Sequence, residues 1–230
     1  MRKLLLPFIA VLVVAAASGS ASAQDAKAGE KKAAMCIGCH GIPAYQASFP
    51  EVHKVPMISG QSAKYIVAAL AAYKKNDRKH PTMKAIAASL SDQDMADLAA
   101  FYSAQAKPGA PAAAASAPTV SEQELIAKLD PKPSPQVAEL IKTGKCLTCH
   151  GANFNNPVDA NTPKLAGQHP DYLYVALKAY QTANNPLVGR ANPAMGGMAV
   201  GLTHAQLKDL SRYIAALPGE LQTVPQPRFR

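Results

Sequence analysis

The chain has 230 residues and a formal net charge of +9 at pH 7, and a chain of this length usually folds into one or two domains. Its lysines are scattered, and no basic run alternates with aromatic residues. We therefore interpret the charge as a generally positive solvated surface and expect no nucleic-acid partner.

The first segment, residues 1–23, is predicted to be a signal peptide. A basic MRK start precedes the apolar run LLLPFIAVLVVAAA, and Ala21-Ser22-Ala23 fits a small-residue cleavage site. The run is shorter than the roughly 18–20 residues that a membrane-spanning helix needs, and Pro7 interrupts it. We expect cleavage after Ala23, a location in the periplasm and no spanning segment in the mature protein. Peripheral association with a membrane stays open.

The mature chain then reads as helix almost throughout, with no alternating run that indicates a strand. Apolar residues recur at helical spacing around 65–73 and 172–180. Helices are predicted before each cysteine motif, at 25–34 and 136–143. Ser91 with Asp94, and Thr203 with Gln206, are predicted to begin two further helices.

A proline- and alanine-rich stretch at 107–119 separates two similar halves, and SEQELIAKLD after it predicts a short helix. The fold class is predicted to be all-α, with two tandem domains. The predicted segments after the signal peptide are domain 1 at 24–107, a linker with a short helix at 108–135, domain 2 at 136–220 and a C-terminal tail at 221–230.

Two short motifs, MCIGCHG at 35–41 and KCLTCHG at 145–151, contain all four cysteines of the chain. A zinc ribbon would need its two cysteine pairs about 15–20 residues apart, and a thioredoxin-like site would need a strand before the motif. In C-x-x-C-H, two thiols bind a haem covalently and the histidine binds its iron. The motifs therefore predict two covalent haem c groups, held by Cys36 and Cys39, with His40, and by Cys146 and Cys149, with His150.

The second iron ligand is predicted from the repeat, because a shared ligand should occupy the same position in both halves. When the halves are aligned on their later helices, one methionine matches, Met83 with Met195. Each is preceded by a proline two residues earlier and an arginine five residues earlier. A methionine is often only a flexible core filler, but this shared context favours iron ligation by Met83 and Met195. The unmatched histidines are expected to be solvated.

Other matched residues carry weaker expectations. The tyrosines of the two central helices are expected to pack rather than to relay electrons. Gln61 and Gln168 open helices and are expected to cap them. Arg78 and Arg190 fit either haem propionates or a solvated loop, and both interpretations stay open.

Together, the signal sequence, the two CxxCHG motifs, the Gly-Gln-x-x-x-Tyr helices and the methionine before Leu-Ser or Leu-Thr resemble dihaem cytochromes of the cytochrome c4 type. The resemblance covers nearly the whole mature chain. It implies two class I cytochrome c domains, each wrapped around a haem with histidine and methionine ligands.

The resemblance also implies a function: an electron carrier, not an enzyme. It would carry single electrons from respiratory-chain or dehydrogenase donors to a terminal oxidase or another acceptor, so its partners would be redox proteins. Two alternatives are the cytochrome subunit of a flavin-dependent sulfide dehydrogenase and a dihaem peroxidase. A peroxidase would need an open iron site, against which the matched methionines argue.

Overall fold

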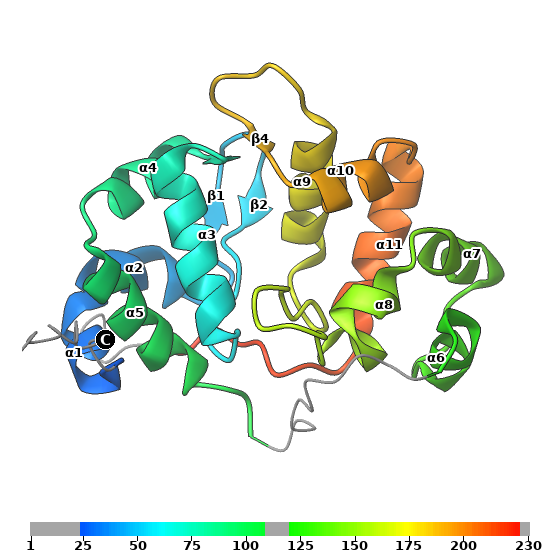
Figure 1. The fold of residues 1–230 in the computed structure, drawn as a ribbon, viewed down its shortest axis with the longest axis horizontal. Helices are drawn as coiled ribbons and strands as arrows, with labels where there is room; N and C mark the ends of the chain where they lie inside the picture. The colour runs from blue at the N-terminus through cyan, green and yellow to red at the C-terminus, as the bar shows by residue number, and fades with distance from the viewer. Residues whose placement is uncertain (1–23, 109–119, 226–230) are drawn as a thin grey trace, which may run out of the picture.

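The computed structural model describes residues 24–108 and 120–225, which form two helical halves lying side by side (Figure 1). The predicted signal peptide lies outside the described residues. The first half contains α1 (Ala26–Lys32), α2 (Ala34–His40), α3 (Ala63–Lys75), α4 (Pro81–Ala88) and α5 (Asp92–Ser103). The second contains α6 (Glu122–Lys128), α7 (Pro135–Thr143), α8 (Cys146–His150), the 3-10 helix η1 (Ala152–Phe154), α9 (Pro170–Gln181), α10 (Pro193–Ala199) and α11 (His204–Ala216). The predicted all-α, two-domain fold class is confirmed.

In the part of the chain that the structure describes, four very short strands depart from the purely helical prediction. β1 (Gln46–Ala47) pairs with β2 (His53–Lys54) within the first half. β3 (Arg78–Lys79) pairs with β4 (Gly189–Arg190) and so joins the two halves. Each strand has two residues, too few for an alternating pattern to be visible in the sequence.

The core of the first half lies where α1 crosses α5. Gly29 of α1 is required there, because a Cβ at this position would lie 2.0 Å from the carbonyl oxygen of Asp97. The buried apolar residues of this core come from α2, α3 and α5, from the residue between α1 and α2 and from the turn before α5: Ala33, Ile37, Ile66, Leu90, Met95, Leu98, Ala99 and Tyr102. The glycine therefore sets the close approach on which the packing of this half depends.

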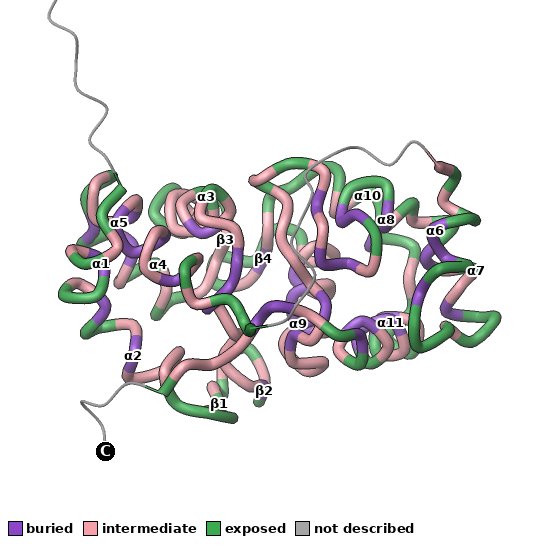
Figure 2. The backbone as a smooth tube through the Cα atoms, turned by 90° about the horizontal axis from the view of Figure 1, so that it is seen from below, coloured by how far each residue is buried: buried purple, intermediate pink, exposed green. Residues whose placement is uncertain are grey.

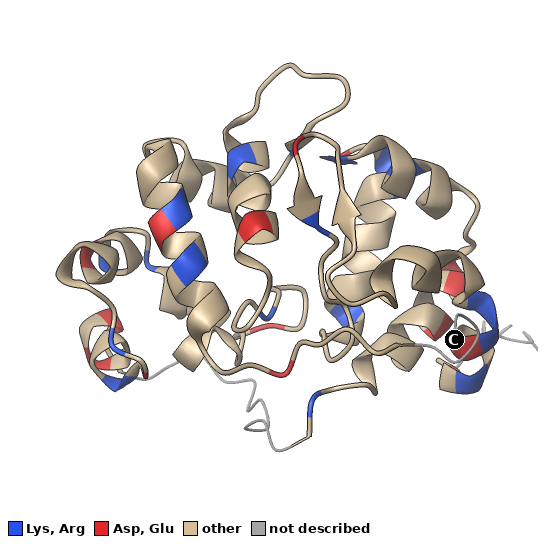
Figure 3. Ribbon diagram, turned by 180° about the vertical axis from the view of Figure 1, so that it is seen from behind, with Lys and Arg blue, Asp and Glu red and all other residues tan. Residues whose placement is uncertain are grey.

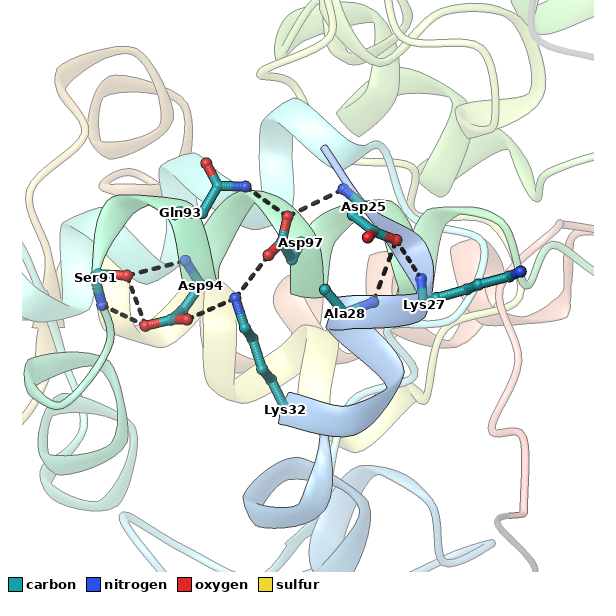
Figure 4. Close-up of polar contacts among 8 residues, drawn as sticks. All are labelled: Asp25, Lys27, Ala28, Lys32, Ser91, Gln93, Asp94 and Asp97. Atoms are coloured by element: carbon teal, nitrogen blue, oxygen red, sulfur yellow. Dashed lines mark hydrogen bonds and ion pairs between the residues drawn. The ribbon is translucent and has the colours of Figure 1, made fainter. Parts of the chain in front are cut away.

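An ionic network lies beside this crossing (Figure 4). Asp97 is 2% exposed, and its carboxylate accepts hydrogen bonds from the Asp25 backbone N–H at 3.0 Å and from Lys32 Nζ at 2.6 Å. Lys32 also lies 2.8 Å from Asp94. The Lys32 ammonium, and then the Asp25 N–H, lower the pKa of Asp97. The network thus ties the start of α1 to the middle of α5.

The core of the second half includes α6, which follows the proline-rich stretch. Leu125, Ile126 and Leu129 are buried, although they lie within the predicted linker at 108–135. They join apolar residues from the later elements: Val137, Ile141, Leu147, Phe154, Ala166, Leu173, Leu210, Ile214 and Leu217. The short helix predicted here is present, and its apolar face packs into the second half because burial of that face is favourable.

Capping boxes begin α5 and α11 as the sequence predicts. The Ser91 hydroxyl accepts from the Asp94 N–H at 3.1 Å, and Thr203 accepts from Gln206 at 3.3 Å. The acidic or amide side chain bonds back to the cap N–H in both cases. None of the described helices is long and apolar enough to cross a membrane.

The C-terminal segment crosses from the second half to the first, beneath both (Figures 1 and 2). Gln222 forms an isolated β-bridge with Ser59, and the Lys107 N–H donates to the Glu220 carbonyl at 2.9 Å. Gln222 Nε2 also donates to the Gln105 carbonyl at 2.9 Å. Residues 220–225, which include the described part of the predicted tail, therefore form a strap that fastens the second half to the first.

Replacing Asp97 with Asn should lower stability in a pH-dependent way. The pKa of Asp97 is lowered in the folded state, so its charge stabilises the fold above the ordinary carboxyl pKa of about 4. This contribution is lost as the pH falls through the lowered pKa. Urea unfolding should show a clear difference between wild type and Asp97→Asn at pH 7 that shrinks below about pH 4. The control is Asp92→Asn on the same helix, whose side chain is exposed; an equal effect of both variants would contradict this account.

Candidate haem sites and the domain interface

The two Cys-x-x-Cys-His motifs lie on α2 and α8, and both histidines are held in the same way. His40 Nδ1 lies 2.9 Å from the Pro56 carbonyl oxygen, and His150 Nδ1 lies 3.0 Å from the Pro163 carbonyl oxygen. A carbonyl oxygen can only accept, so Nδ1 carries the proton in each ring. This leaves each Nε2 unprotonated, which is the state that binds a metal.

Burial favours the neutral form of these imidazoles. It lowers the pKa of His40 and of His150, while the proline carbonyls oppose the shift. The charged neighbours differ: Arg78 and His80 lower the pKa of His40 further, whereas Asp159 raises that of His150. The two sites therefore share a hydrogen bond but not an electrostatic environment.

No disulfide joins any of the four cysteines, so all four are available for the attachment of two haems. Burial raises the pKa of Cys36. Burial also raises the pKa of Cys146 to about 12, and the negative charge of Glu122 adds to the shift. Cys149 is exposed.

Met83 and Met195 occupy the same place in matching helices. Each is the third residue of a short helix that begins with proline, α4 or α10, and each is half-buried. The Met83 N–H donates to His80 Nδ1 at 3.4 Å, and the Met195 N–H donates to Asn192 Oδ1 at 3.0 Å. The matched residues His80 and Asn192 therefore cap the helices that carry the methionines.

Two histidines expected to be solvated are engaged instead. His80 caps α4, as described above, because its imidazole replaces the asparagine of the other half. His53 is 5% exposed; its Nδ1 lies 2.8 Å from the Glu51 carbonyl oxygen, and its ring stacks on Tyr172 at 6.3 Å between centroids. Tyr172 belongs to the other half, so no local signal in the sequence indicates this contact.

Pairing of β3 with β4 places Arg78 opposite Arg190 at the centre of the domain interface. Tyr172 Oη accepts from Arg78 Nη2 at 2.7 Å and from Arg190 Nη2 at 3.1 Å. Arg78 also donates to Tyr65 Oη at 3.2 Å and lies 4.6 Å from the centroid of the Tyr73 ring. Arg190 lies 5.3 Å from the centroid of the Tyr180 ring. The four matched tyrosines thus pack around two guanidinium groups rather than within single helices.

These two guanidinium groups have no acidic partner among the described residues. Arg78 Nε is buried and has no hydrogen-bond acceptor. Burial by itself would raise the pKa of Tyr172, but the positive charges of Arg78 and Arg190 lower it to about 8. The interface therefore holds an uncompensated positive charge and an unused donor, which suit an anionic group. The solvated-loop interpretation of these arginines is wrong.

Gln61 and Gln168 make reciprocal bonds across the same interface. Gln61 Nε2 donates to the Lys164 carbonyl, and the Lys164 N–H donates back to Gln61 Oε1, both at 3.0 Å. Gln168 does the same with Met57, at 2.9 and 3.0 Å. Each Oε1 also accepts from the next N–H along the chain. The N-caps of α3 and α9 are Ser62 and His169, so the cap role expected for the glutamines is wrong. They join the halves about an approximate two-fold axis instead.

Ion pairs surround this centre. Lys178 lies 2.6 Å from Glu51, and Lys54 lies 3.7 Å from Asp171. Lys164 pairs with Glu220 of the C-terminal segment. The first two pairs cross the interface, whereas Lys164 and Glu220 both belong to the second half. Lys164 Nζ reaches the first half by donating to the Gly60 carbonyl at 3.1 Å, so the two halves are held in one arrangement.

Comparison with known proteins shows which family the chain belongs to. Two segments match the cytochrome c family, residues 26–104 and 136–218. The chain belongs to the cytochrome c family. Each matched segment contains one Cys-x-x-Cys-His motif and one of the two matched methionines.

The cytochrome is similar along most of its length to cytochrome c4. It is 28% identical to cytochrome c4 of Stutzerimonas stutzeri over 91% of this chain and 97% of that protein. It is 29% identical to a thiosulfate dehydrogenase electron acceptor of the same species, over 90% and 91% of the two chains. The crystal structure of reduced cytochrome c4 from Pseudomonas stutzeri matches with a TM-score of 0.59 and 28% identity, over 85% and 100%.

The cytochrome is therefore a tandem protein of the cytochrome c4 type. Its two cytochrome c domains carry two covalently bound haem c groups, and its function is electron transfer.

Replacing Gln168 with Leu should weaken the interface. The substitution leaves the Met57 N–H and carbonyl without partners, which costs about 1–3 kcal/mol. Thermal unfolding of the haem-loaded protein should occur at lower temperature or separate into two transitions, as followed by calorimetry. Gln123→Leu is the control, because Gln123 is exposed on α6. Equal stability of wild type and Gln168→Leu would contradict the role of these bonds.

Proposed function

We propose that the cytochrome is a periplasmic carrier of single electrons in which each iron has histidine and methionine ligands. His40 and Met83 would bind one iron, and His150 and Met195 the other, with Cys36, Cys39, Cys146 and Cys149 attaching the haems. The observation that carries this proposal is that both halves hold the histidine by a proline carbonyl and the methionine at the third position of a capped helix.

The chain's own residues fit this role. The bonds from Nδ1 orient each imidazole and increase its basicity as a ligand. A methionine as the second iron ligand would raise the reduction potential relative to harder ligands. The haem supplies the change between ferrous and ferric iron, while the protein sets orientation, solvent access and local charge.

Arg78 and Arg190 would contribute by neutralising haem propionates. The support is the uncompensated charge at the interface and the unused Arg78 Nε. A guanidinium matches the planar geometry of a carboxylate. This role would tie both haems to the contact between the domains, because β3 and β4 belong to different halves.

A carrier of this kind would catalyse no change of covalent bonds. Filled ligand positions on both irons would leave no site for peroxide, which separates the proposed carrier from a dihaem peroxidase. The proposed donors are respiratory-chain complexes or dehydrogenases, and the proposed acceptor is a terminal oxidase or another redox protein. The periplasmic location rests on the predicted signal peptide at residues 1–23.

A second candidate is an electron acceptor dedicated to a dehydrogenase of sulfur compounds. The support is the similarity to a thiosulfate dehydrogenase electron acceptor along most of both chains. The cytochrome subunit of a flavin-dependent sulfide dehydrogenase belongs to the same functional class. Isolation from its native membrane and soluble fractions discriminates, because a dedicated subunit would copurify with its dehydrogenase.

Removing either methionine should remove its share of the methionine–iron signal. Met83→Ala should abolish about half of the near-infrared band of the oxidised protein, and Met195→Ala the other half, since each iron contributes one such bond. Met57→Ala is the control, because Met57 aligns with Lys164 of the second half and so has no matching methionine there. A loss caused by Met57→Ala, or an intact band in Met83→Ala, would overturn the ligand assignment. Mass spectrometry of each denatured variant should still show two bound haems.

Electron transfer to an acidic redox protein should slow as salt is added. Lysines and arginines are spread over both halves among fewer acidic residues (Figure 3). Salt screens the attraction between such surfaces over about 8 Å at physiological ionic strength. Lys84, exposed on α4 next to Met83, is the residue to test: Lys84→Glu should slow oxidation in stopped flow, whereas Lys128→Glu on α6 should have less effect. A rate independent of salt and of Lys84 would indicate apolar contact instead.

A further inference from the structure

The second haem-binding helix has a carboxylate fixed to it. Glu122, the first residue of α6, accepts a hydrogen bond from the Leu147 N–H at 2.8 Å and from the Thr148 hydroxyl at 2.9 Å. Both donors lie between Cys146 and Cys149 of the motif. Glu122 also acts electrostatically on the Cys146 thiol, so its charge is close to a haem attachment point.

The first half has no counterpart to this contact. There α1 leads into α2 through Ala33, and the Ile37 N–H, which matches that of Leu147, donates to the Ala33 carbonyl at 3.0 Å. Gly38 stands where the second half has Thr148, so no hydroxyl is present. In the second half, Lys145 with φ of +45° interrupts the helix. This interruption leaves the Leu147 N–H available to Glu122.

The position of Glu122 is enforced by the core. Leu125, Ile126 and Leu129 follow Glu122 by three, four and seven positions, so they bury the face of α6 from which Glu122 also projects. Ser121 with Glu124 caps the start of the helix. Among residues 24–108 and 120–225, no lysine or arginine forms an ion pair with Glu122. Its negative charge therefore stays beside α8, with no direct counter-ion.

We propose that Glu122 is a positioning residue that lowers the reduction potential of the second haem and so makes the two haems inequivalent. A nearby carboxylate favours the ferric form, which carries one more positive charge than the ferrous form. The partly buried contact weakens screening by salt. The hydrogen bonds also fix the segment between the two cysteines, an outer contact of the kind that tunes haem potentials. This inference rests on the proposed attachment of a haem to Cys146, Cys149 and His150.

The test is a redox titration of the haem-loaded protein followed by proton NMR, in which the haem-methyl resonances report on each haem separately. Glu122→Gln keeps the side-chain length and an acceptor oxygen but removes the charge. The midpoint of the second haem should rise, increasing its ferrous-to-ferric ratio at a fixed potential about threefold to tenfold, or roughly 30–60 mV at 59 mV per tenfold change. The first haem should not change.

Glu124→Gln is the matched control, because Glu124 lies on the same helix and bonds only to Ser121 in its capping box. It should leave both midpoints unchanged. Glu122→Asp, which retains the charge, should stay closer to wild type than Glu122→Asn, and this pair replaces the first comparison if Glu122→Gln fails to fold. A purely structural role would change unfolding but not the midpoint.

Two failures can be told apart. If mass spectrometry shows two haems and the second midpoint is unmoved, moves downward or moves together with the first, the role of Glu122 is overturned. If the mass shows fewer than two haems in the wild type, the proposed function itself fails.

Discussion

Two positively charged side chains lie next to each other where the halves of this molecule join, and the arrangement of the domains depends on the groups that offset their repulsion. Arg78 and Arg190 are paired on β3 and β4, and they share the Tyr172 hydroxyl as acceptor. Repulsion between two buried guanidiniums would separate the domains unless something offset it. The tyrosine rings offset part of it by cation–π contact, and an anion from each haem would offset the rest. On this view, haem binding and domain docking depend on the same charges.

The remainder of the interface follows from the repeat. Gln61 and Gln168 each bond to the backbone just before the other's helix, at Lys164 and Met57. The same glutamine position, present in both halves, thus makes hydrogen bonds that can form only when the halves face each other. The strap formed by Gln222 and Glu220 then closes the arrangement from the C-terminal side. A firm interface suits a carrier, because fixed positions of the two haems keep rearrangement during electron transfer small.

The two halves also differ at some positions, and these differences give the two haem sites separate properties. Arg190 comes ten positions after Tyr180, whereas Arg78 comes only five positions after Tyr73. The longer loop reaches the first half, where Lys79 Nζ donates to the Asn185 carbonyl at 2.7 Å. Asp159 affects His150, whereas Arg78 and His80 affect His40. Similar ligand sets therefore stand in different electrostatic surroundings, which is how one chain can give two haems different potentials.

The sequence by itself determined the helical class, the tandem organisation and the chemistry of the motifs, because those depend on local periodicity and on residues a few positions apart. The caps at Ser91 and Thr203 were readable for the same reason. The assignment of iron ligands to Met83 and Met195 also came from the sequence, since the two copies could be compared position by position; it stays a prediction. Only the tertiary structure decided what joins the halves: the strand pair of Arg78 with Arg190, the burial of His53 and the reach of Gln61 to Lys164. These contacts link residues about a hundred positions apart, and no local pattern encodes which distant backbone group a buried side chain will meet. The contact of Glu122 with α8 spans only 25 positions, but the sequence did not indicate it either, because the composition of this segment resembles a linker and only the packed structure shows its apolar face in the core.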